Sequence, residues 1–211
     1  MFSLAIDAHG VARRFGANWV LRGVTLSVGA GEVVGLLGAN GSGKSTLLRV
    51  LATLIRPHAG DAQVCGHDVV RDADQVRASI GFLAHAPGLY DDLTARENLI
   101  FSAAMLDRDE REVDGALERA GLLPVASERV RGFSSGMQRR LSIARLMLIR
   151  PRVLLLDEPF ANLDRAGCDL MTSLIEEWVR GGAAALVVLH ELAPAAGILD
   201  RTVTIENGCI A

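Results

Sequence analysis

The sequence predicts an α/β protein with a parallel sheet core, an N-terminal antiparallel β-layer and an inserted helical subdomain. Three observations predict this fold class. Near-continuous apolar runs alternate with helical patterns, which is typical of a parallel sheet covered by helices on both faces. Residues 2–28 contain shorter, partly alternating apolar runs between glycines, which favour antiparallel strands. Dense charges and helical patterns mark residues 89–131, which we interpret as a helical insertion.

Length and composition fit one domain with an aliphatic core. The chain has 211 residues, of which 50% are hydrophobic and 4% aromatic. That length suffices to bury a sizeable core, so we expect one domain over 1–211. Its core is expected at about 1–85 and 141–211, and its helical subdomain at about 86–140. The net charge of −3 gives no electrostatic reason to expect a nucleic acid partner.

Cysteine usage and hydropathy predict a cytoplasmic protein. Cys65, Cys168 and Cys209 are odd in number and far apart, so we expect reduced thiols rather than a disulfide framework or a metal site. No apolar run approaches the roughly 18 residues that a membrane span needs. The N-terminus lacks the basic-then-apolar pattern of a signal peptide. Any membrane role is therefore expected to come through a partner.

The N-terminal β-layer is expected to consist of short strands joined by tight turns at Gly10, Gly16, Gly23 and Gly29. Phe15 lies just ahead of one of these turns. Its ring can stack on a nucleotide base or pack as an ordinary core side chain, and the sequence alone leaves both interpretations open.

Residues 38–46 fit the phosphate-loop pattern G-x-x-x-x-G-K-[ST]. They lie between an apolar strand at 33–37 and a helix expected at 46–54, and this context makes the pattern specific. Glycines let successive N–H groups point at phosphate oxygens, and the helix N-terminus adds roughly half a positive charge. The alternative is a chance glycine-rich turn. The expected nucleotide contacts are Gly38, Asn40, Gly41, Ser42, Gly43, Lys44, Ser45 and Thr46.

Two side chains of this loop are expected to carry its chemistry. Lys44 should reach the β- and γ-phosphates, and Ser45 should offer its hydroxyl to Mg²⁺. Lys44 is also the only lysine in the chain, since every other basic residue that is not histidine is arginine. A compact ammonium fits a phosphate nest where a planar guanidinium does not, which explains why lysine remains at this one position.

Helices and strands alternate through the rest of the chain. Thr94 begins a capping box, Asp107 is expected to cap the second inserted helix, and Gly121 is expected to end it. A helix opens at 133–138 and is closed by Pro151. The other expected helices are 72–79, 94–105, 108–120 and one from Asp164 to about Arg180. The expected strands are 61–66, 80–84, 153–156 and 184–189, with a closing hairpin around Asn207-Gly208.

Four apolar strands each end in a candidate site residue. The first leads into the phosphate loop, and the others end at His85, at Asp157-Glu158 and at His190. Ligands of parallel sheets bind outside the carboxyl ends of the strands, so these residues are expected to converge. Asp157 has the placement of a Mg²⁺-side carboxylate, and Glu158 can orient or deprotonate the attacking water. The alternative for Asp-Glu-Pro is a polar strand exit followed by a turn.

Further stretches complete an ordered set. Phe133-Ser134-Ser135-Gly136-Met137 precedes the strand that ends at Asp157, and Ala161-Asn162-Leu163-Asp164 follows that strand. With the phosphate loop and His190, this order resembles the nucleotide-binding subunit of an ATP-binding cassette (ABC) transporter over essentially the whole chain. In this resemblance, 133–137 corresponds to the family's Leu-Ser-Gly-Gly-Gln signature, 161–164 to its D-loop and His190 to its switch histidine.

The resemblance implies a P-loop NTPase (RecA-like) core that binds ATP with Mg²⁺ and hydrolyses the ATP. It implies that Glu158, His190 and Lys44 are catalytic, and that Ser45 and Asp157 serve the metal. His85 stands where the family usually has glutamine, a position that serves the metal and the nucleotide. The remaining nucleotide contacts that it implies are Phe15 as the base-stacking aromatic, Ser134, Gly136 and Asp164.

The resemblance also implies partners. Ser134 and Gly136 would serve the γ-phosphate of a second ABC ATPase chain, so that two chains sandwich two ATP molecules. A transmembrane permease subunit would dock beside 85–96 and hold the chain, peripherally, on the inner face of the cell membrane. The chain departs from the family pattern at His85, and in the signature at Ser135 and Met137.

The transported substrate is expected to contact only the partner, so this sequence carries little direct information about the identity of the substrate. Local matches at 85–88, 94–99, 157–160 and 164–167 resemble the ATPase of the haem exporter used in cytochrome c biogenesis. An exporter of a drug, lipid or antibiotic is the alternative within the family. A soluble ABC ATPase of DNA repair or translation is the alternative from another class, and it lacks support because the chain has neither a long coiled-coil insertion nor a second cassette. A small-molecule kinase would leave the signature unexplained.

Overall fold

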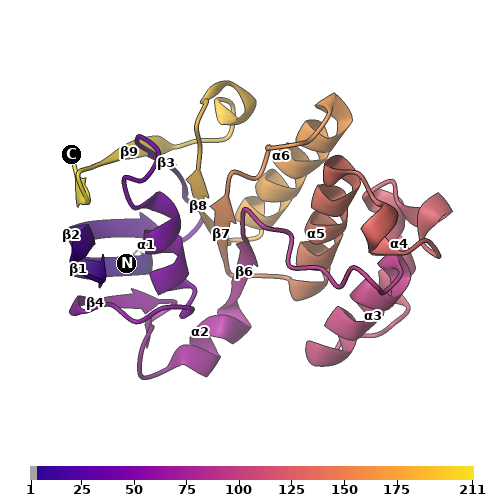
Figure 1. Ribbon diagram of the computed structural model, residues 1–211, viewed down its shortest axis with the longest axis horizontal. Helices are drawn as coiled ribbons and strands as arrows, with labels where there is room; N and C mark the ends of the chain where they lie inside the picture. The colour runs from indigo at the N-terminus through magenta and orange to yellow at the C-terminus, as the bar shows by residue number, and fades with distance from the viewer. Residues whose placement is uncertain (1–3) are drawn as a thin grey trace. The chain divides into compact units, whose positions relative to one another are not determined.

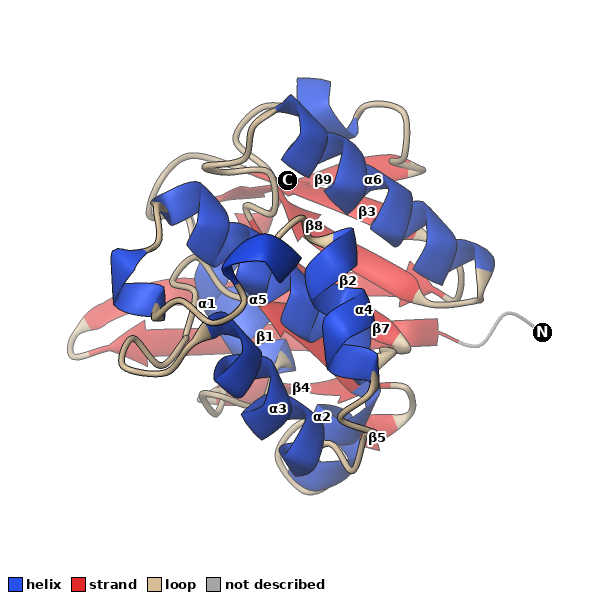
Figure 2. Ribbon diagram, turned by 90° about the vertical axis from the view of Figure 1, so that its right-hand side faces the viewer, coloured by secondary structure: helices blue, strands red, loops and turns tan. Residues whose placement is uncertain are grey.

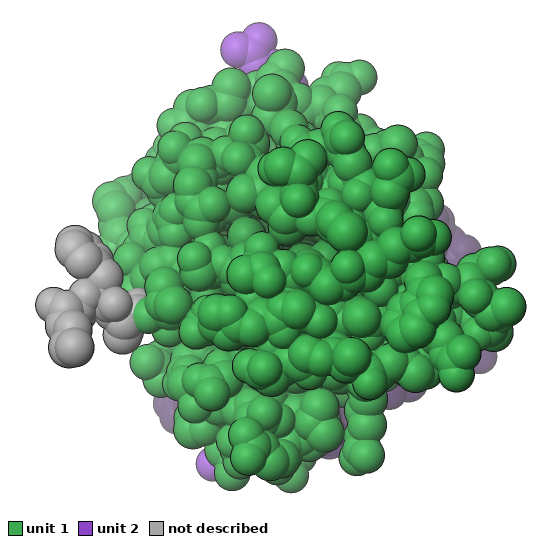
Figure 3. All heavy atoms as spheres, turned by 90° about the vertical axis from the view of Figure 1, so that its left-hand side faces the viewer, with its two compact units in different colours: residues 1–82, 151–159, 175–211 green, residues 83–150, 160–174 purple. Residues whose placement is uncertain are grey.

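The structure is a computed structural model that describes residues 4–211. The chain divides into two compact units, which Figure 3 colours separately. We call Met1–Phe82, Pro151–Pro159 and Ile175–Ala211 the sheet unit, and Leu83–Arg150 and Phe160–Leu174 the helical unit. The helical unit is larger than the insertion expected at 86–140, because one continuous helix runs across residue 140.

A six-stranded sheet forms the core, in the order β10-β9-β3-β8-β7-β6. β3 pairs in parallel with β8 and β9, and β7 pairs in parallel with β8. Every residue of β7 and β8 is buried, which explains their unbroken apolar sequences. The predicted parallel α/β core is therefore confirmed. The strands are β3 (Val33–Leu37), β6 (Ile80–Leu83), β7 (Val153–Asp157), β8 (Ala184–Val188), β9 (Arg201–Glu206) and β10 (Cys209–Ile210).

A four-stranded antiparallel sheet, in the order β2-β1-β4-β5, forms the predicted β-layer. The expectation of several short strands was wrong, because Gly10 and Gly23 lie inside long strands. The register shifts between Ala8 and Val11, so Gly10 sits in a bulge that keeps the strand going. Gly16 does form the expected turn. The strands are β1 (Leu4–Phe15), β2 (Asn18–Gly29), β4 (Ala59–Val64) and β5 (His67–Asp68); residues 2 and 3 of the prediction lie outside the described residues.

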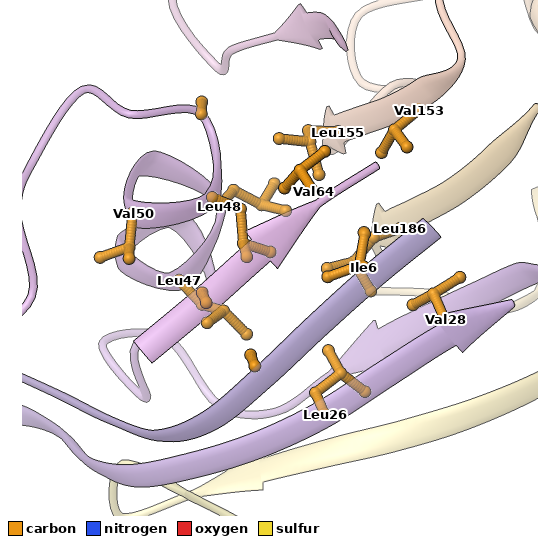
Figure 4. Packing of buried hydrophobic residues seen from close by; sticks show 14 of the residues in the cluster. Ile6, Leu26, Val28, Leu47, Leu48, Val50, Val64, Val153, Leu155 and Leu186 are labelled. Atoms are coloured by element: carbon orange, nitrogen blue, oxygen red, sulfur yellow. The ribbon is translucent and has the colours of Figure 1, made fainter. Parts of the chain in front are cut away.

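Helix α1 (Lys44–Leu51) follows the phosphate loop and joins both sheets into one core. It begins two residues earlier than expected and ends three residues earlier, before Thr53 adopts a positive φ of 62°. Figure 4 shows Leu47 and Leu48 of this helix among side chains from β1, β4, β7 and β8. This packing anchors the start of α1, and with it the loop. A short helix, α2 (Ala73–Ser79), precedes β6.

The helical unit has its own apolar core, built by α3 (Ala95–Met105), α4 (Glu112–Arg119) and α5 (Ser135–Ile149), which lie against one another in Figures 1 and 2. The Thr94 capping box and the end of α4 at Gly121 are confirmed. The prediction that Asp107 caps the second helix was wrong. Asp107 has a φ of 52°, and the helix begins only at Glu112. Two short 3₁₀ turns, η1 (Leu123–Val125) and η2 (Val130–Gly132), precede α5.

The C-terminal elements follow the predicted order. Asp164 caps α6 (Arg165–Arg180), since its Oδ1 accepts the Gly167 N–H at 2.9 Å. A 3₁₀ turn, η3 (Ala193–Ala195), links β8 to β9. Asn207 and Gly208 both have positive φ values, of 51° and 82°, and form the tight turn between β9 and β10.

Candidate nucleotide-binding site

The phosphate loop connects β3 to α1. At two of its positions, the backbone conformation and the close neighbours leave room only for glycine. Gly38 has a φ of 143°, and a Cβ there would lie 2.3 Å from the Ile205 carbonyl oxygen. Gly43 has a φ of 114°, and a Cβ there would lie 2.7 Å from the Leu21 side chain. Two glycines therefore set the curl of the loop by close approach to neighbouring strands.

Lys44 is 5% exposed, and its Nζ donates to the Gly38 and Ala39 carbonyl oxygens at 2.6 and 2.9 Å. The ammonium is thus held over the start of the loop, with a third donor left for another acceptor. The Ser42 hydroxyl is buried and makes no protein hydrogen bond. Leaving a buried hydroxyl without a hydrogen-bond partner lowers the stability of the fold by about 1–3 kcal/mol. A bound ligand that accepts a hydrogen bond from Ser42 would restore that free energy.

Ser45 and Asp157 come from elements far apart in sequence, yet the Ser45 Oγ donates to the Asp157 Oδ1 at 3.2 Å. Asp157 ends β7 and is 3% exposed. A hydroxyl and a carboxylate are the hard oxygen ligands that Mg²⁺ prefers, usually together with phosphates and water. Among residues 4–211 no cluster of three or more His, Cys, Asp or Glu side chains could hold a metal alone. The pair therefore fits a metal that is bound together with a nucleotide.

Glu158 and His190 form the second pair, with 2.6 Å between the Glu158 Oε1 and the His190 Nε2. Glu158 has a φ of 51°, in the left-handed region that residues other than glycine rarely adopt. Both side chains are partly exposed, at 23% for Glu158 and 44% for His190. The pair is accessible to water and to a ligand.

Strand order explains why these residues meet. β8, which leads to His190, lies between β3 and β7 in the sheet, and all three run parallel. Their carboxyl ends carry the phosphate loop, His190 and Asp157-Glu158 side by side. The expected convergence of these three segments is thus observed within the sheet unit. His85 follows β6 but belongs to the helical unit, so its relation to this edge stays a prediction.

A groove of about 720 Å³ adjoins the phosphate loop, a size typical of small-molecule sites. Sequence reasoning missed it, because its walls come from the β1–β2 hairpin, the loop itself and the β9–β10 turn. The one local sequence feature that could have indicated the groove is Trp19, a second aromatic residue in the same hairpin as Phe15. Phe15 is 46% exposed, with the Arg13 guanidinium 4.9 Å from its ring centroid. The groove is lined by residues 18–20, 38–42 and 204–208, with Arg22.

Two of the predicted stretches of the helical unit, 133–137 and 161–164, lie close to one another. Ser134 is the N-cap of α5, and its Oγ accepts the Met137 N–H at 3.2 Å. A Cβ on Gly136 would lie 3.0 Å from the Asn162 carbonyl oxygen, so the signature stretch touches the 161–164 loop. Asp164 pairs with Arg140, and the pKa of its carboxyl is lowered by the Gly167 N–H and by Arg140.

Comparison with known proteins decides the family. Residues 21–161 match the ABC transporter family. The chain belongs to that family. It is 39% identical, over 99% of its length and 67% of the relative's, to the daunorubicin resistance ATP-binding protein DrrA3 of Streptomyces coeruleorubidus. It is 40% identical, over 88% of its length and 82% of the relative's, to the cytochrome c biogenesis ATP-binding export protein CcmA of Bordetella bronchiseptica.

A solved structure supports the same assignment. The dimeric post-hydrolysis state of the ATP-binding cassette MJ0796, bound to ADP and Pi, superposes with a TM-score of 0.85 at 27% identity, over 97% of this chain and 96% of that one. The present chain is thus an ABC ATPase, the ATP-binding subunit of a transporter, and its P-loop NTPase fold is confirmed. No helix within residues 4–211 is long and apolar enough to cross a bilayer.

Proposed function

We propose that this ABC ATPase drives a membrane exporter by closing and reopening an ATP-sandwich dimer, with Glu158 and His190 as its hydrolytic pair. The 2.6 Å contact between these two side chains, beside the phosphate loop, carries the proposal. Taken separately, Glu158 and His190 are polar residues at the ends of two strands, and neither indicates catalysis. Together they supply a carboxylate that can take a proton and an imidazole that holds the carboxylate in place.

Hydrolysis in this proposal begins with the phosphates in the loop. Backbone N–H groups at the start of α1 and the Lys44 ammonium bind the β- and γ-phosphates, and the Ser42 hydroxyl gains the acceptor that it lacks. Glu158 accepts a proton from the attacking water as the water's oxygen bonds to the γ-phosphorus, while the bond from the γ-phosphorus to the β–γ bridging oxygen breaks and ADP leaves with that oxygen. His190 orients Glu158 and donates to a γ-phosphate oxygen. Phe15 stacks on the base from the hairpin beside the groove.

The metal in this proposal is Mg²⁺, with Ser45 and Asp157 as its protein ligands. When bound, it would neutralise charge on the phosphate oxygens. The 3.2 Å hydrogen bond between the two side chains already holds both oxygens in one place. We assign His85 to the same site on its position after β6, with the imidazole standing in for the usual glutamine amide.

We include a second protomer in the proposal because, among residues 4–211, the phosphate loop is the one phosphate-binding element beside Lys44. We propose that Ser134 and Gly136, at the start of α5, bind the γ-phosphate held by the partner chain, with Asp164 close by. A helix start with free N–H groups is an anion site, and α5 runs for 15 residues behind it. The dimeric cassette with ADP and Pi supports this arrangement.

For the permease contact we propose an apolar surface on the helical unit, which we call the α3 patch: Tyr90, Phe101, Met105 and Leu106. Met105 is 74% exposed and Tyr90 54%, and the Tyr90 and Phe101 rings meet edge to face with centroids 5.1 Å apart. Large apolar side chains gathered in the open favour a protein partner. The patch includes Tyr90, which belongs to the stretch 85–96 where the permease is expected. This contact would hold the chain on the cytoplasmic face of the membrane.

Met105→Glu is expected to release the permease, because a carboxylate would lose its hydration in an apolar interface. A tagged chain is isolated from membranes, and co-purifying multi-span proteins are identified by mass spectrometry. Leu54→Glu is the matched control, since Leu54 is an exposed apolar residue of the sheet unit, at 58% exposure. A permease that still co-purifies with Met105→Glu, at the level seen with Leu54→Glu, would contradict the assignment of the patch.

For the substrate we propose haem, exported for cytochrome c biogenesis. The support is the 40% identity to CcmA together with the local stretches at 85–88 and 157–160. Drug export is the competing proposal, favoured by the 39% identity to DrrA3.

Deleting the gene separates the two proposals. Haem export predicts loss of c-type cytochromes, seen as missing bands in a haem-stained gel, with unchanged anthracycline sensitivity. Drug export predicts normal cytochromes and increased sensitivity. Complementation with Glu158→Gln should fail in either case, while complementation with Leu54→Glu should succeed. Normal cytochromes in the deletion strain would remove the haem proposal.

A further inference from the structure

Lys44 is the only lysine in the chain, so the chain has a single side-chain amine. An arginine guanidinium keeps its proton and its charge, whereas a lysine amine can be acylated. Any acylation of a lysine in this chain therefore occurs in the phosphate loop. The surroundings of Lys44 decide which acylating compounds can reach its amine.

The Lys44 amine is held inside the loop. The residue is 5% exposed, and its Nζ donates to the Gly38 and Ala39 carbonyl oxygens at 2.6 and 2.9 Å. These two contacts leave one of the Nζ hydrogens for another acceptor. A neutral reagent has to enter a buried position to meet this amine, and it carries no group that the loop would bind.

Groups that bind phosphate surround the same amine. The first hydrogen bond of α1 runs from the Leu47 N–H to the Gly43 carbonyl oxygen at 2.9 Å, and the N–H groups before it are those that a helix start offers to an anion. The Ser42 hydroxyl is buried without a protein hydrogen bond. It lies beside Gly38, where a Cβ would be 2.7 Å from the hydroxyl oxygen. A phosphate bound by these groups is expected next to the Lys44 Nζ.

Acyl phosphates combine the two features that this site selects. Each carries a phosphate group, and its electrophilic carbonyl carbon is separated from the phosphorus by a single oxygen atom. With the phosphate held by the loop, the acyl carbon comes within reach of the Lys44 amine. Binding both reactants in one complex replaces a collision in solution, and this raises the rate of reaction by a large factor.

We propose that the phosphate loop also binds acyl phosphates, and that Lys44 is acylated there, which switches the ATPase off. The Lys44 nitrogen attacks the acyl carbon and forms an amide bond, while the bond from that carbon to the phosphate oxygen breaks. Inorganic phosphate leaves with this oxygen and takes up the two protons that the ammonium loses. The proposal rests on the proposed function, which places the phosphates of ATP in the same loop.

Acylation of Lys44 should remove ATP binding for two reasons. The amide nitrogen has no charge and carries one hydrogen in place of three, so it cannot bind the β- and γ-phosphates as the ammonium does. The acyl group also occupies the space in which the phosphates would lie. Because ATP and acyl phosphates compete for one loop, the nucleotide-free chain should be acylated and the nucleotide-bound chain should be protected.

The experiment compares two acetylating reagents on the full chain. Acetyl phosphate carries the phosphate group, whereas N-acetoxysuccinimide acetylates amines without one. Cleavage at arginine gives the peptide 23–49, which contains Lys44, and the peptide 1–13, which carries the α-amino group. Mass spectrometry measures the acetylation of each peptide. The α-amino group is the internal reference, because it is not part of the loop.

Acetyl phosphate is expected to favour Lys44 over the α-amino group at least about tenfold more than N-acetoxysuccinimide does. Mg-ADP should protect Lys44 and leave the α-amino group unchanged, and ATP turnover should fall in proportion to the acetylation of Lys44. Arg49→Lys is the matched control, because it adds an exposed amine to the same helix outside the loop. The two reagents should acetylate that added amine in the same ratio to the α-amino group.

An equal preference for Lys44 with the two reagents, with Mg-ADP protecting it from both, would overturn the acylation proposal and leave the proposed function standing. Turnover that persists after complete acetylation of Lys44 would overturn the switch. An amine added by Arg49→Lys that shows the same preference for acetyl phosphate would remove the loop as the source of selectivity. If Mg-ADP neither protects Lys44 nor binds by calorimetry, the phosphate-loop assignment fails, and both proposals fail with it.

Discussion

Glu158→Gln is expected to lower ATP turnover by about two to four orders of magnitude, the usual contribution of a general base. The amide keeps the shape of the side chain and its reach to His190, but it cannot accept a proton from water. Binding should survive, because the phosphate loop and Lys44 are untouched. The variant should therefore accumulate as an ATP-loaded dimer that forms and does not reopen.

Release of phosphate measures the expected loss of turnover, and sedimentation with Mg-ATP measures the expected accumulation of the dimer. Glu191→Gln is the matched control, since Glu191 is an exposed acid beside His190 and should retain normal turnover. His190→Ala removes the other side of the 2.6 Å contact and should also reduce turnover strongly. Persistent hydrolysis by a folded Glu158→Gln protein that stays monomeric would show that another group activates the water.

Lys44→Ala is expected to abolish tight ATP binding. The ammonium is held by two loop carbonyl oxygens at the position where phosphates would enter, and no second lysine exists to replace it. Each charge-assisted hydrogen bond contributes about 1.5–3 kcal/mol, so losing even one weakens binding by about tenfold to a hundredfold. Calorimetric titration with ATP measures the loss.

Arg49→Ala is the control for Lys44→Ala, since it removes a positive charge from the exposed side of the same helix. It should bind ATP as the parent does. The single lysine also allows a direct footprint. Besides the α-amino group, an amine-directed reagent can modify only Lys44, and ATP should protect it. Normal affinity in Lys44→Ala, or modification that ATP leaves unchanged, would remove the phosphate-loop assignment.

Features that depend on neighbouring residues could be predicted from the sequence. All residues of β7 and β8 are buried, and so is β3 except for the half-buried Leu37, so these strands appear in the sequence as nearly unbroken apolar runs. The caps at Thr94 and Asp164 need only a side chain and an N–H three residues further on. The phosphate loop is contiguous, so its strand, glycines and lysine could be recognised together.

Features that join distant residues were decided only by the tertiary structure. Gly10 looks like a turn residue in sequence, but pairing with β2 and β4 makes it a bulge, because the neighbouring strands continue past it. The sequence placed Glu158 and His190 at two strand ends, yet their 2.6 Å contact depends on β8 lying beside β7. Arg145 reaches Gly88 across 57 positions. Such contacts leave no local pattern, because their partners are chosen by packing of the whole fold.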